Sequence, residues 1–149
     1  MKTLLVSLIW LIACQEAALR PVEIAAEDMC ALCKMAISEK RFAAEFINRD
    51  GDAFKFDDIS CMTRYIEGKR NRNAIAGYFV VDFDSREWVR GEEAHYVRSS
   101  ELQTPMGGGI VAFKDRPKAE AAVTKYQGEH LSFNDLLNSP QRHEGIKTH

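Results

Sequence analysis

Two groups of sulfur-bearing residues have the most specific chemistry in this chain. The first is the segment CALCKM at positions 30–35, in which Cys33 is followed two residues later by Met35. The second is TPMGGG at positions 104–109, which carries Met106. Thiolate and thioether sulfur together suit the soft ion Cu(I), whereas zinc accepts thiolates but rarely thioethers. The CxxC pair followed by Met35, together with Met106 in a glycine-rich loop, therefore predicts a site for monovalent copper.

Met106 stands between Pro105 and three consecutive glycines. Glycines permit close backbone approach and unusual dihedral angles, and we expect thin side-chain packing around a methionine in such a loop. The thioether would then be accessible, as an exchangeable metal site requires. The alternative is a tight turn that carries a partly exposed methionine.

The cysteines also allow a zinc or a redox interpretation. Cys30 and Cys33 form a CxxC pair and Cys61 falls in the first turn of a predicted helix, which is the outline of a zinc knuckle. Structural zinc almost always has four ligands, and His95 is the candidate that the sequence offers for the fourth. A CxxC pair can instead form a disulfide or a redox centre, although a thioredoxin-like centre stands before a long helix and this pair precedes a predicted hairpin. Cys30 and Cys61 are therefore further candidates for metal binding or redox chemistry.

The N-terminus predicts an extracytoplasmic protein with a lipid anchor. Lys2 precedes an apolar stretch at positions 4–12 that is too short to span a bilayer and leads into the sequence LIAC. This sequence is typical of a bacterial lipobox, so residues 1–13 are predicted to be a signal peptide and Cys14 to be lipidated. An ordinary secretory signal is the alternative. The lipid would hold the protein on a membrane facing the periplasm, and Gln15 in place of Asp favours the outer membrane.

Length and composition limit the functional classes. After cleavage, the 149-residue chain leaves enough for one domain. The formal net charge of −2 for the full chain gives no basic surface for nucleic acid. The sequence has no phosphate-binding loop, no Ser/His/Asp triad and no paired acid–base residues. We therefore expect a binding protein that is not an enzyme and has no nucleic-acid partner.

The periodicity predicts an α+β fold in which two consecutive ββαβ-like units form one compact domain. For the first unit we expect a hairpin at 41–57 that turns at Asp50-Gly51, a helix capped by Asp57 or Asp58 and ended by Gly68, and a strand at 74–83. For the second we expect strands at 95–98 and 109–113, a helix from Arg116-Pro117 to Gly128, and a strand at 131–133 followed by a short helical turn at 135–137. Residues 14–27 are predicted to be a tether, residues 28–138 the domain and residues 139–149 a flexible polar tail.

The order of these motifs resembles the NosL family. The order is a lipobox, a CxxC-x-Met segment, a phenylalanine-rich hairpin ending in FDD, an aromatic strand ending in VDF, and a TPMG loop, over about residues 28–137. The resemblance implies an α+β fold of two ββαβ units, in agreement with the repeat above. It also implies a Cu(I) chaperone that delivers copper for the copper–sulfide centre of nitrous-oxide reductase, with an ABC-type membrane complex as partner. Another copper protein remains open as the client.

Within this resemblance, Cys33 and Met35 match the family's Cys-Gly-Met ligand motif, and Met106 matches the methionine of its Thr-Pro-Met-Gly motif. Lys34 stands where the family has glycine, and we expect its cation to lower the pKa of the neighbouring thiol and to alter the turn. Copper would pass to the client by ligand exchange, because a site with few ligands lets an incoming donor bind before another leaves. The architecture is related to that of organomercurial lyases, which leaves carbon–metal bond cleavage as an enzymatic alternative by fold analogy alone.

Overall fold

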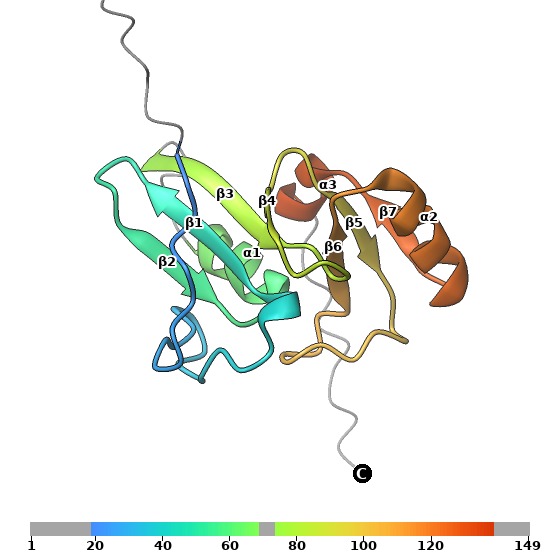
Figure 1. Ribbon diagram of the computed structural model, residues 1–149, viewed down its shortest axis with the longest axis horizontal. Coiled ribbons are helices and arrows are strands. Elements are labelled where there is room, and N and C mark those ends of the chain that lie inside the picture. Colours follow the sequence, from blue (N-terminus) through green and yellow to red (C-terminus); the bar gives the residue numbers. More distant parts are fainter. Residues whose placement is uncertain (1–18, 69–73, 139–149) are drawn as a thin grey trace, which may run out of the picture.

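The computed structural model describes residues 19–68 and 74–138. Within them, two antiparallel sheets lie side by side and three α-helices pack against them (Figure 1). None of the helices in these residues is long and apolar enough to cross a membrane. The predicted signal peptide, Cys14 and the predicted tail at 139–149 lie outside the described residues.

The first sheet is built on the predicted phenylalanine-rich hairpin. β1 (Ala44–Asn48) pairs with β2 (Ala53–Phe56), and Gly51 has a φ of 90° in the turn between them. β3 (Ile75–Val81) pairs with the other edge of β1, and β4 (Trp88–Arg90) pairs with β3. The sheet therefore has the order β2-β1-β3-β4.

Helix α1 (Ile59–Glu67) connects β2 to β3 and begins at a carboxylate cap. Asp58 is the N-cap residue, and its side chain accepts a hydrogen bond of 2.7 Å from the backbone N–H of Ser60. Gly68 is the C-cap, as the sequence predicted. The apolar stripe of this helix is buried, and its members are Ile59, Met62 and Ile66.

The second sheet repeats the arrangement of the first. β5 (His95–Arg98) and β6 (Ile110–Phe113) pair as a hairpin, helix α2 (Arg116–Lys125) follows, and β7 (Glu129–Leu131) pairs with the free edge of β5. The resulting order β6-β5-β7 matches the order β2-β1-β3 of the first unit. The predicted α+β fold of two consecutive ββαβ units is therefore confirmed.

The end of the second unit differs from the prediction. β7 ends at Leu131 and α3 (Phe133–Asn138) follows at once, whereas the sequence suggested a strand at 131–133. The reason is a capping box at Ser132, whose hydroxyl accepts from the backbone N–H of Asp135 while the Asp135 carboxylate accepts from the backbone N–H of Ser132. These reciprocal bonds start a helix at Phe133.

The central core lies between the two sheets around α1. This helix contacts β1 and β2 of the first sheet, β6 of the second sheet, and α3. Its buried side chains pack with apolar residues from both sheets, among them Phe46, Phe56, Tyr96 and Ile110. Helix α2 packs against β5, β6 and β7 and buries Ala119 and Ala122 in a separate cluster.

The N-terminal segment at 19–27 packs against the opposite face of the first sheet. Ile24 is buried with Ile37, Ala43 and Val81, and the backbone N–H of Val22 donates to a carboxylate oxygen of Glu45 at 2.9 Å. The described part of the predicted tether therefore belongs to the packed domain. This segment leads directly into the cysteine motif.

Candidate metal centre

The segment CALCKM folds into a tight knuckle that is closed by backbone hydrogen bonds. Met29 and Ala36 form an isolated antiparallel bridge across its base, and the backbone N–H of Cys30 donates to the carbonyl of Met35 at 2.8 Å. The N–H of Lys34 donates to the carbonyl of Cys30 at 3.0 Å. The N–H of Ala31 also donates to the carbonyl of Lys55 in β2 at 2.8 Å, so both cysteines are held in place relative to β2.

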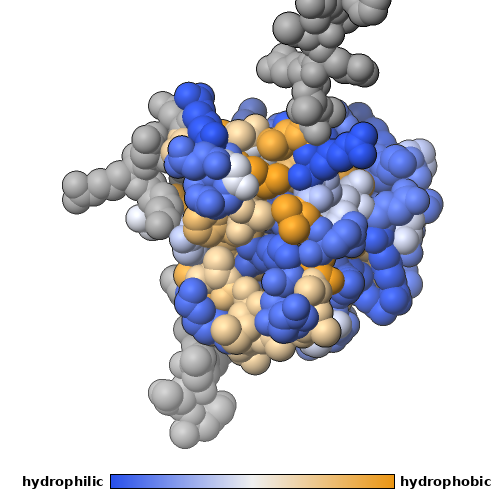
Figure 2. Space-filling model, turned by 60° about the vertical axis from the view of Figure 1, so that its left-hand side comes forward, coloured by the Kyte–Doolittle hydropathy of each residue, from blue (hydrophilic) through white to orange (hydrophobic). Residues whose placement is uncertain are grey.

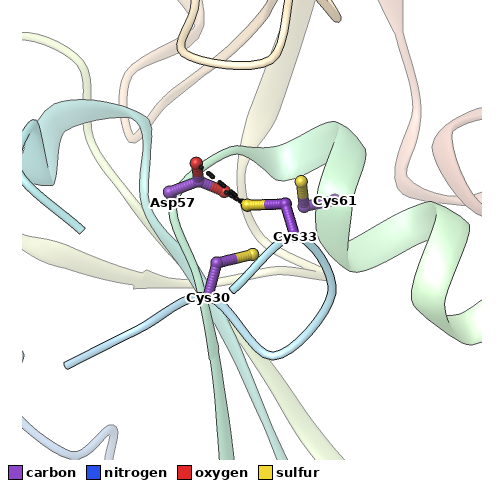
Figure 3. Close-up of side chains that lie close together, drawn as sticks. All are labelled: Cys30, Cys33, Asp57 and Cys61. Carbon is purple, nitrogen blue, oxygen red and sulfur yellow. Dashed lines mark hydrogen bonds between the residues drawn. The ribbon is translucent and has the colours of Figure 1, made fainter. Parts of the chain in front are cut away.

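Four potential metal ligands converge beside this knuckle. One ligand atom each from Cys30, Cys33, Asp57 and Cys61 lies within 4.8 Å of all the others (Figure 3). Asp57 comes directly after β2, and Cys61 lies in the first turn of α1. Four donors at 2.0–2.3 Å from one tetrahedral ion stand roughly 3.5–4 Å apart, so small side-chain adjustments would bring all four onto one ion.

The cluster has a buried side and a partly open side. Cys30 and Cys61 are fully buried and Asp57 is 4% exposed, whereas Cys33 is only half-buried. Figure 3 shows the sulfur of Cys33 directed at the Asp57 carboxylate, to which it donates at 3.5 and 3.6 Å. Cys33 is therefore the member of the cluster that an incoming ion or partner can reach first.

The three thiols differ in their tendency to ionise. A hydrogen bond from Cys61 and backbone N–H groups lower the pKa of Cys30 to about 6 despite its burial. Donation to Cys30 and burial raise the pKa of Cys61, and burial is the main cause of the raised pKa of Cys33. No disulfide joins the three, which are free cysteines. Among the three, Cys30 is therefore the thiol that ionises most readily.

Lys34 does not act on Cys33 as the sequence suggested. Its ammonium donates to the carbonyl of Ala31 at 2.9 Å, on the knuckle itself. The predicted lowering of the Cys33 pKa is wrong, because burial dominates and raises it. Lys34 has a φ of 63°, in the left-handed region that favours glycine, which gives a physical reason for a glycine at this position.

Met106 reaches the same region from the second unit. Its backbone N–H donates to the second carboxylate oxygen of Asp58 at 3.0 Å, so the N-cap of α1 also holds the TPMG loop. The half-buried Met106 side chain packs against the central core cluster that contains Cys30 and Cys61, as Cys33 also does. Residues more than 70 positions apart in the chain are therefore brought together at the start of α1.

The loop around Met106 is packed more tightly than expected. A β-carbon at Gly108 would collide with the side chain of Ser60, and one at Gly109 would collide with the carbonyl of Ser99. The expectation of thin packing is therefore wrong at these two positions, because the loop lies directly on the first turn of α1. The expectation is correct at Gly107, where nothing lies within 4 Å of an added β-carbon.

Met35 lies on the outside of the knuckle. This residue is 57% exposed, and Met29 is 60% exposed. The exposed large apolar residues of the described chain also include Leu19 and Val22, so all of them belong to the N-terminal segment or the knuckle. Figure 2 shows apolar patches interrupted by hydrophilic residues on the side of the molecule that carries β1 and β2.

Sequence reasoning missed Asp57 as a potential ligand. The FDD motif offered two carboxylates before a helix, and both were treated as candidates for the cap. Asp58 takes the cap, which leaves Asp57 free to face the thiols. His95, the candidate that the sequence offered for the fourth ligand, is not among the four clustered residues within the described part of the chain, and its ring lies 5.8 Å from that of His130.

Comparison with known proteins tests the family resemblance. The model of the NosL family matches residues 21–139, which is most of the chain and spans both units. The chain belongs to the NosL family. The crystal structure of the copper chaperone NosL from Shewanella denitrificans matches with a TM-score of 0.71 and 17% identity, over 81% of this chain and 98% of that chain. At this identity the match shows the shared NosL fold. A comparison with curated proteins gave no match.

Proposed function

We propose that this NosL-family protein is a Cu(I) chaperone that binds copper through Cys33, Met35 and Met106. The observation that carries the proposal is the position of Cys33, the accessible thiol of the cluster, with Met35 beside it on the surface and Met106 packed against the same core. The structural relative from Shewanella denitrificans is itself described as a copper chaperone. Family membership also supports the prediction that the chain is not an enzyme.

The three donors suit a transferable monovalent ion. The thiolate of Cys33 supplies one negative charge, which neutralises Cu⁺, and the two thioethers are soft donors that do not protonate. Met35 is exposed and Met106 is half-buried, so the proposed three-ligand copper site is open on the side of the knuckle that faces solvent. A sulfur or imidazole donor of a client can bind from that side before a methionine leaves, which is transfer by ligand exchange.

The proposed client is nitrous-oxide reductase, with an ABC-type membrane complex as the assembly partner. The proposed location is a membrane surface facing the periplasm, to which a lipid on Cys14 holds the domain. The outer membrane is favoured by Gln15. These proposals rest on the sequence and the family, and another copper protein is the alternative client.

The test of copper binding is an anaerobic Cu(I) titration in competition with a chromogenic chelator. The chain from residue 15 onward keeps every described residue and is the protein to use. We expect Cys33→Ser to abolish tight binding and Met106→Ala to weaken it by tenfold or more, with circular dichroism unchanged. Met35→Ala should weaken it as well, whereas Met29→Ala is the matched control because Met29 is equally exposed on the same knuckle.

Two results would contradict this assignment. Unchanged Cu(I) affinity in Cys33→Ser would show that the thiolate of Cys33 is not a copper ligand. Equal losses in Met29→Ala and Met35→Ala would mean that the knuckle surface acts without a specific thioether ligand. Delivery is tested separately, by mixing the Cu(I)-loaded protein with apo nitrous-oxide reductase and measuring the copper that the reductase gains.

A further inference from the structure

We propose that the N-terminal segment and the knuckle form a surface that rests on the phospholipid bilayer. The apolar members of this surface are Leu19, Val22, Met29 and Met35, all of which are exposed. The inference rests on the proposed lipid at Cys14, and it adds which face of the domain the bilayer contacts.

The first argument is that the N-terminal segment has a fixed course across the first sheet (Figure 1). Leu19 lies over Gly77 of β3, where an added β-carbon would stand 2.6 Å from a side-chain carbon of Leu19. The backbone N–H of Val22 donates to the carboxylate of Glu45 in β1 at 2.9 Å. The carbonyl of the next residue accepts from Nζ of Lys55 in β2 at 2.7 Å. The segment therefore crosses three strands on the face opposite to α1.

The second argument is the length of the tether. Because the segment is held from Leu19 onward, residues 15–18 are all that separates the proposed anchor at Cys14 from the packed domain. An extended chain of that length reaches at most about 18 Å from Cys14 to Leu19. A domain of roughly 100 residues has a radius of gyration of about 13 Å, so it is about 35 Å across. The tether is therefore too short for the opposite side of the domain to reach the bilayer.

The third argument is where the exposed apolar residues lie. Within residues 19–68 and 74–138, every exposed large apolar residue belongs to the N-terminal segment or to the knuckle that follows it. Isolated exposed apolar residues are ordinary on soluble proteins, whereas these four follow one another along a segment that begins beside the anchor. Contact with the boundary between headgroups and acyl chains removes such side chains from water, which stabilises a domain that lies on the bilayer.

The charges of this surface favour a contact made by its apolar groups. Arg20, Glu23, Glu27 and Lys34 are the exposed charged residues of the N-terminal segment and the knuckle, two of each sign. They give no net attraction to anionic lipid. The contact should therefore form on zwitterionic phosphatidylcholine and should not weaken as salt is added.

The place of Met35 on this surface has a consequence for copper transfer. Met35 is also one of the proposed copper ligands, so a domain that lies on the bilayer holds that side of the copper site at the membrane. A partner held in the membrane can then reach the site, while the bilayer shields it from soluble copper-binding proteins. This consequence alone rests on the proposed copper ligands.

Trp88 is an intrinsic reporter for the test. It is the one tryptophan outside the predicted signal peptide, and it packs against Ile24 of the N-terminal segment and Val81 of β3. The full chain is produced in a bacterium, its lipid on Cys14 is verified by mass spectrometry, and it is placed in phosphatidylcholine vesicles. Some of the phosphatidylcholine carries a spin label on its headgroup, which quenches nearby tryptophan. We expect the label to reduce Trp88 fluorescence by about half or more.

A reporter on the other side of the first sheet measures the orientation. The variant Trp88→Phe, Arg64→Trp moves the tryptophan to an exposed position on α1, opposite to the N-terminal segment. We expect quenching at position 64 to be at least about twofold weaker than at Trp88, because the bilayer lies on the far side of the sheet.

Two double variants test the apolar contact itself. Leu19→Ser with Val22→Ser should weaken the quenching of Trp88, because the domain then turns freely on its tether. Arg20→Gln with Glu23→Gln is the matched control, since it changes the same segment but keeps the apolar side chains. This control should leave the quenching unchanged.

The outcomes separate this inference from the proposals on which it rests. Equal quenching of the two reporters, or unchanged quenching of Trp88 in Leu19→Ser, Val22→Ser, would overturn it. A dimer of the lipid-free chain that this double variant abolishes would also overturn it, because a second copy would then cover the surface. If mass spectrometry finds no lipid on Cys14, the proposed anchor fails and the inference fails with it. The measurements contain no copper, so failure of the proposed copper ligands does not alter them.

Discussion

At the scale of single residues, Lys34 is where the sequence conflicts with the backbone that it must adopt. Its φ of 63° lies in a region that disfavours a residue with a β-carbon, at a cost of about 1–2 kcal/mol. The knuckle imposes this conformation because the N–H of Lys34 must reach the carbonyl of Cys30. The side chain gains one exposed hydrogen bond, to Ala31, in return.

Replacement of Lys34 by glycine should therefore stabilise the protein. We expect Lys34→Gly to be more stable than Lys34→Ala by about 1 kcal/mol, since both variants lose the ammonium but only alanine keeps the strained φ. The measurement is the free energy of unfolding in urea under reducing conditions. A glycine variant no more stable than the alanine variant would show that the left-handed conformation carries no strain here.

At the scale of elements, the start of α1 organises the site. Asp58 caps the helix with one carboxylate oxygen and holds the backbone of Met106 with the other. Asp57 and Cys61, on either side of it in the chain, face the thiols of the knuckle. Gly108 lets the Met106 loop lie against Ser60 of the same helical turn. One helix terminus thus connects both sequence motifs.

Gly108→Ala should push this loop away from α1. The added methyl group overlaps the Ser60 side chain, so we expect a loss of about 1–3 kcal/mol in stability and weaker Cu(I) binding through Met106. The double variant Gly108→Ala, Ser60→Gly removes the colliding atoms. It should lose less stability than the sum of the losses in the two single variants. Urea unfolding of all four proteins measures this coupling.

Gly68→Ala is the matched control for the Gly108→Ala and Ser60→Gly variants. Gly68 ends the same helix, and an added β-carbon there would meet only ordinary contacts, the nearest being the carbonyl of Tyr65 at 3.6 Å. It should leave Cu(I) affinity unchanged. Strictly additive effects of Gly108→Ala and Ser60→Gly would contradict the proposed contact.

At the scale of the whole molecule, Asp82 joins the two ββαβ units. It is 1% exposed and accepts from the backbone N–H of Lys114 at 2.6 Å, across the junction between the sheets. It also accepts from the N–H groups of Asp84 and Ser85 in its own turn. Burial alone would raise the pKa of Asp82, but these hydrogen bonds outweigh burial and hold the pKa below its ordinary value of 3.8.

This lowered pKa predicts how stability depends on pH. A carboxyl group with a lowered pKa in the folded state stabilises the fold above its unfolded pKa, and that stability is lost as the pH falls through the folded pKa. Asp82→Asn should therefore cost about 1–3 kcal/mol near neutral pH, and the difference from the wild type should shrink below about pH 4. Urea unfolding between pH 3 and pH 7 measures it.

Asp84→Asn is the control for the pH series. Asp84 is an exposed carboxylate in the same turn, so its replacement should change stability by less than about 0.5 kcal/mol. If the free energies of unfolding of Asp82→Asn and the wild type differ by the same amount from pH 7 to pH 3, the link between the units does not depend on the ionised carboxylate.

The local elements could be predicted from the sequence because each depends on neighbours in the chain. The alternating phenylalanines around Asp50-Gly51 specify β1 and β2, and the stripe with Ile59 and a capping aspartate specifies α1. The repeated order of these patterns was enough for the α+β fold and the family. The boundary at Phe133 was missed because the capping box at Ser132 competes with a short apolar strand.

The composition of the site was decided only by tertiary structure. The sequence shows which residues carry donor atoms, so Cys30, Cys33 and Cys61 could be named from it as candidate ligands. Which of the two adjacent aspartates caps α1 and which faces the thiols depends on how β2 enters the helix. The burial that raises the Cys33 pKa, and the contact that places Met106 at the start of α1, come from packing between segments distant in the chain, which local patterns do not encode.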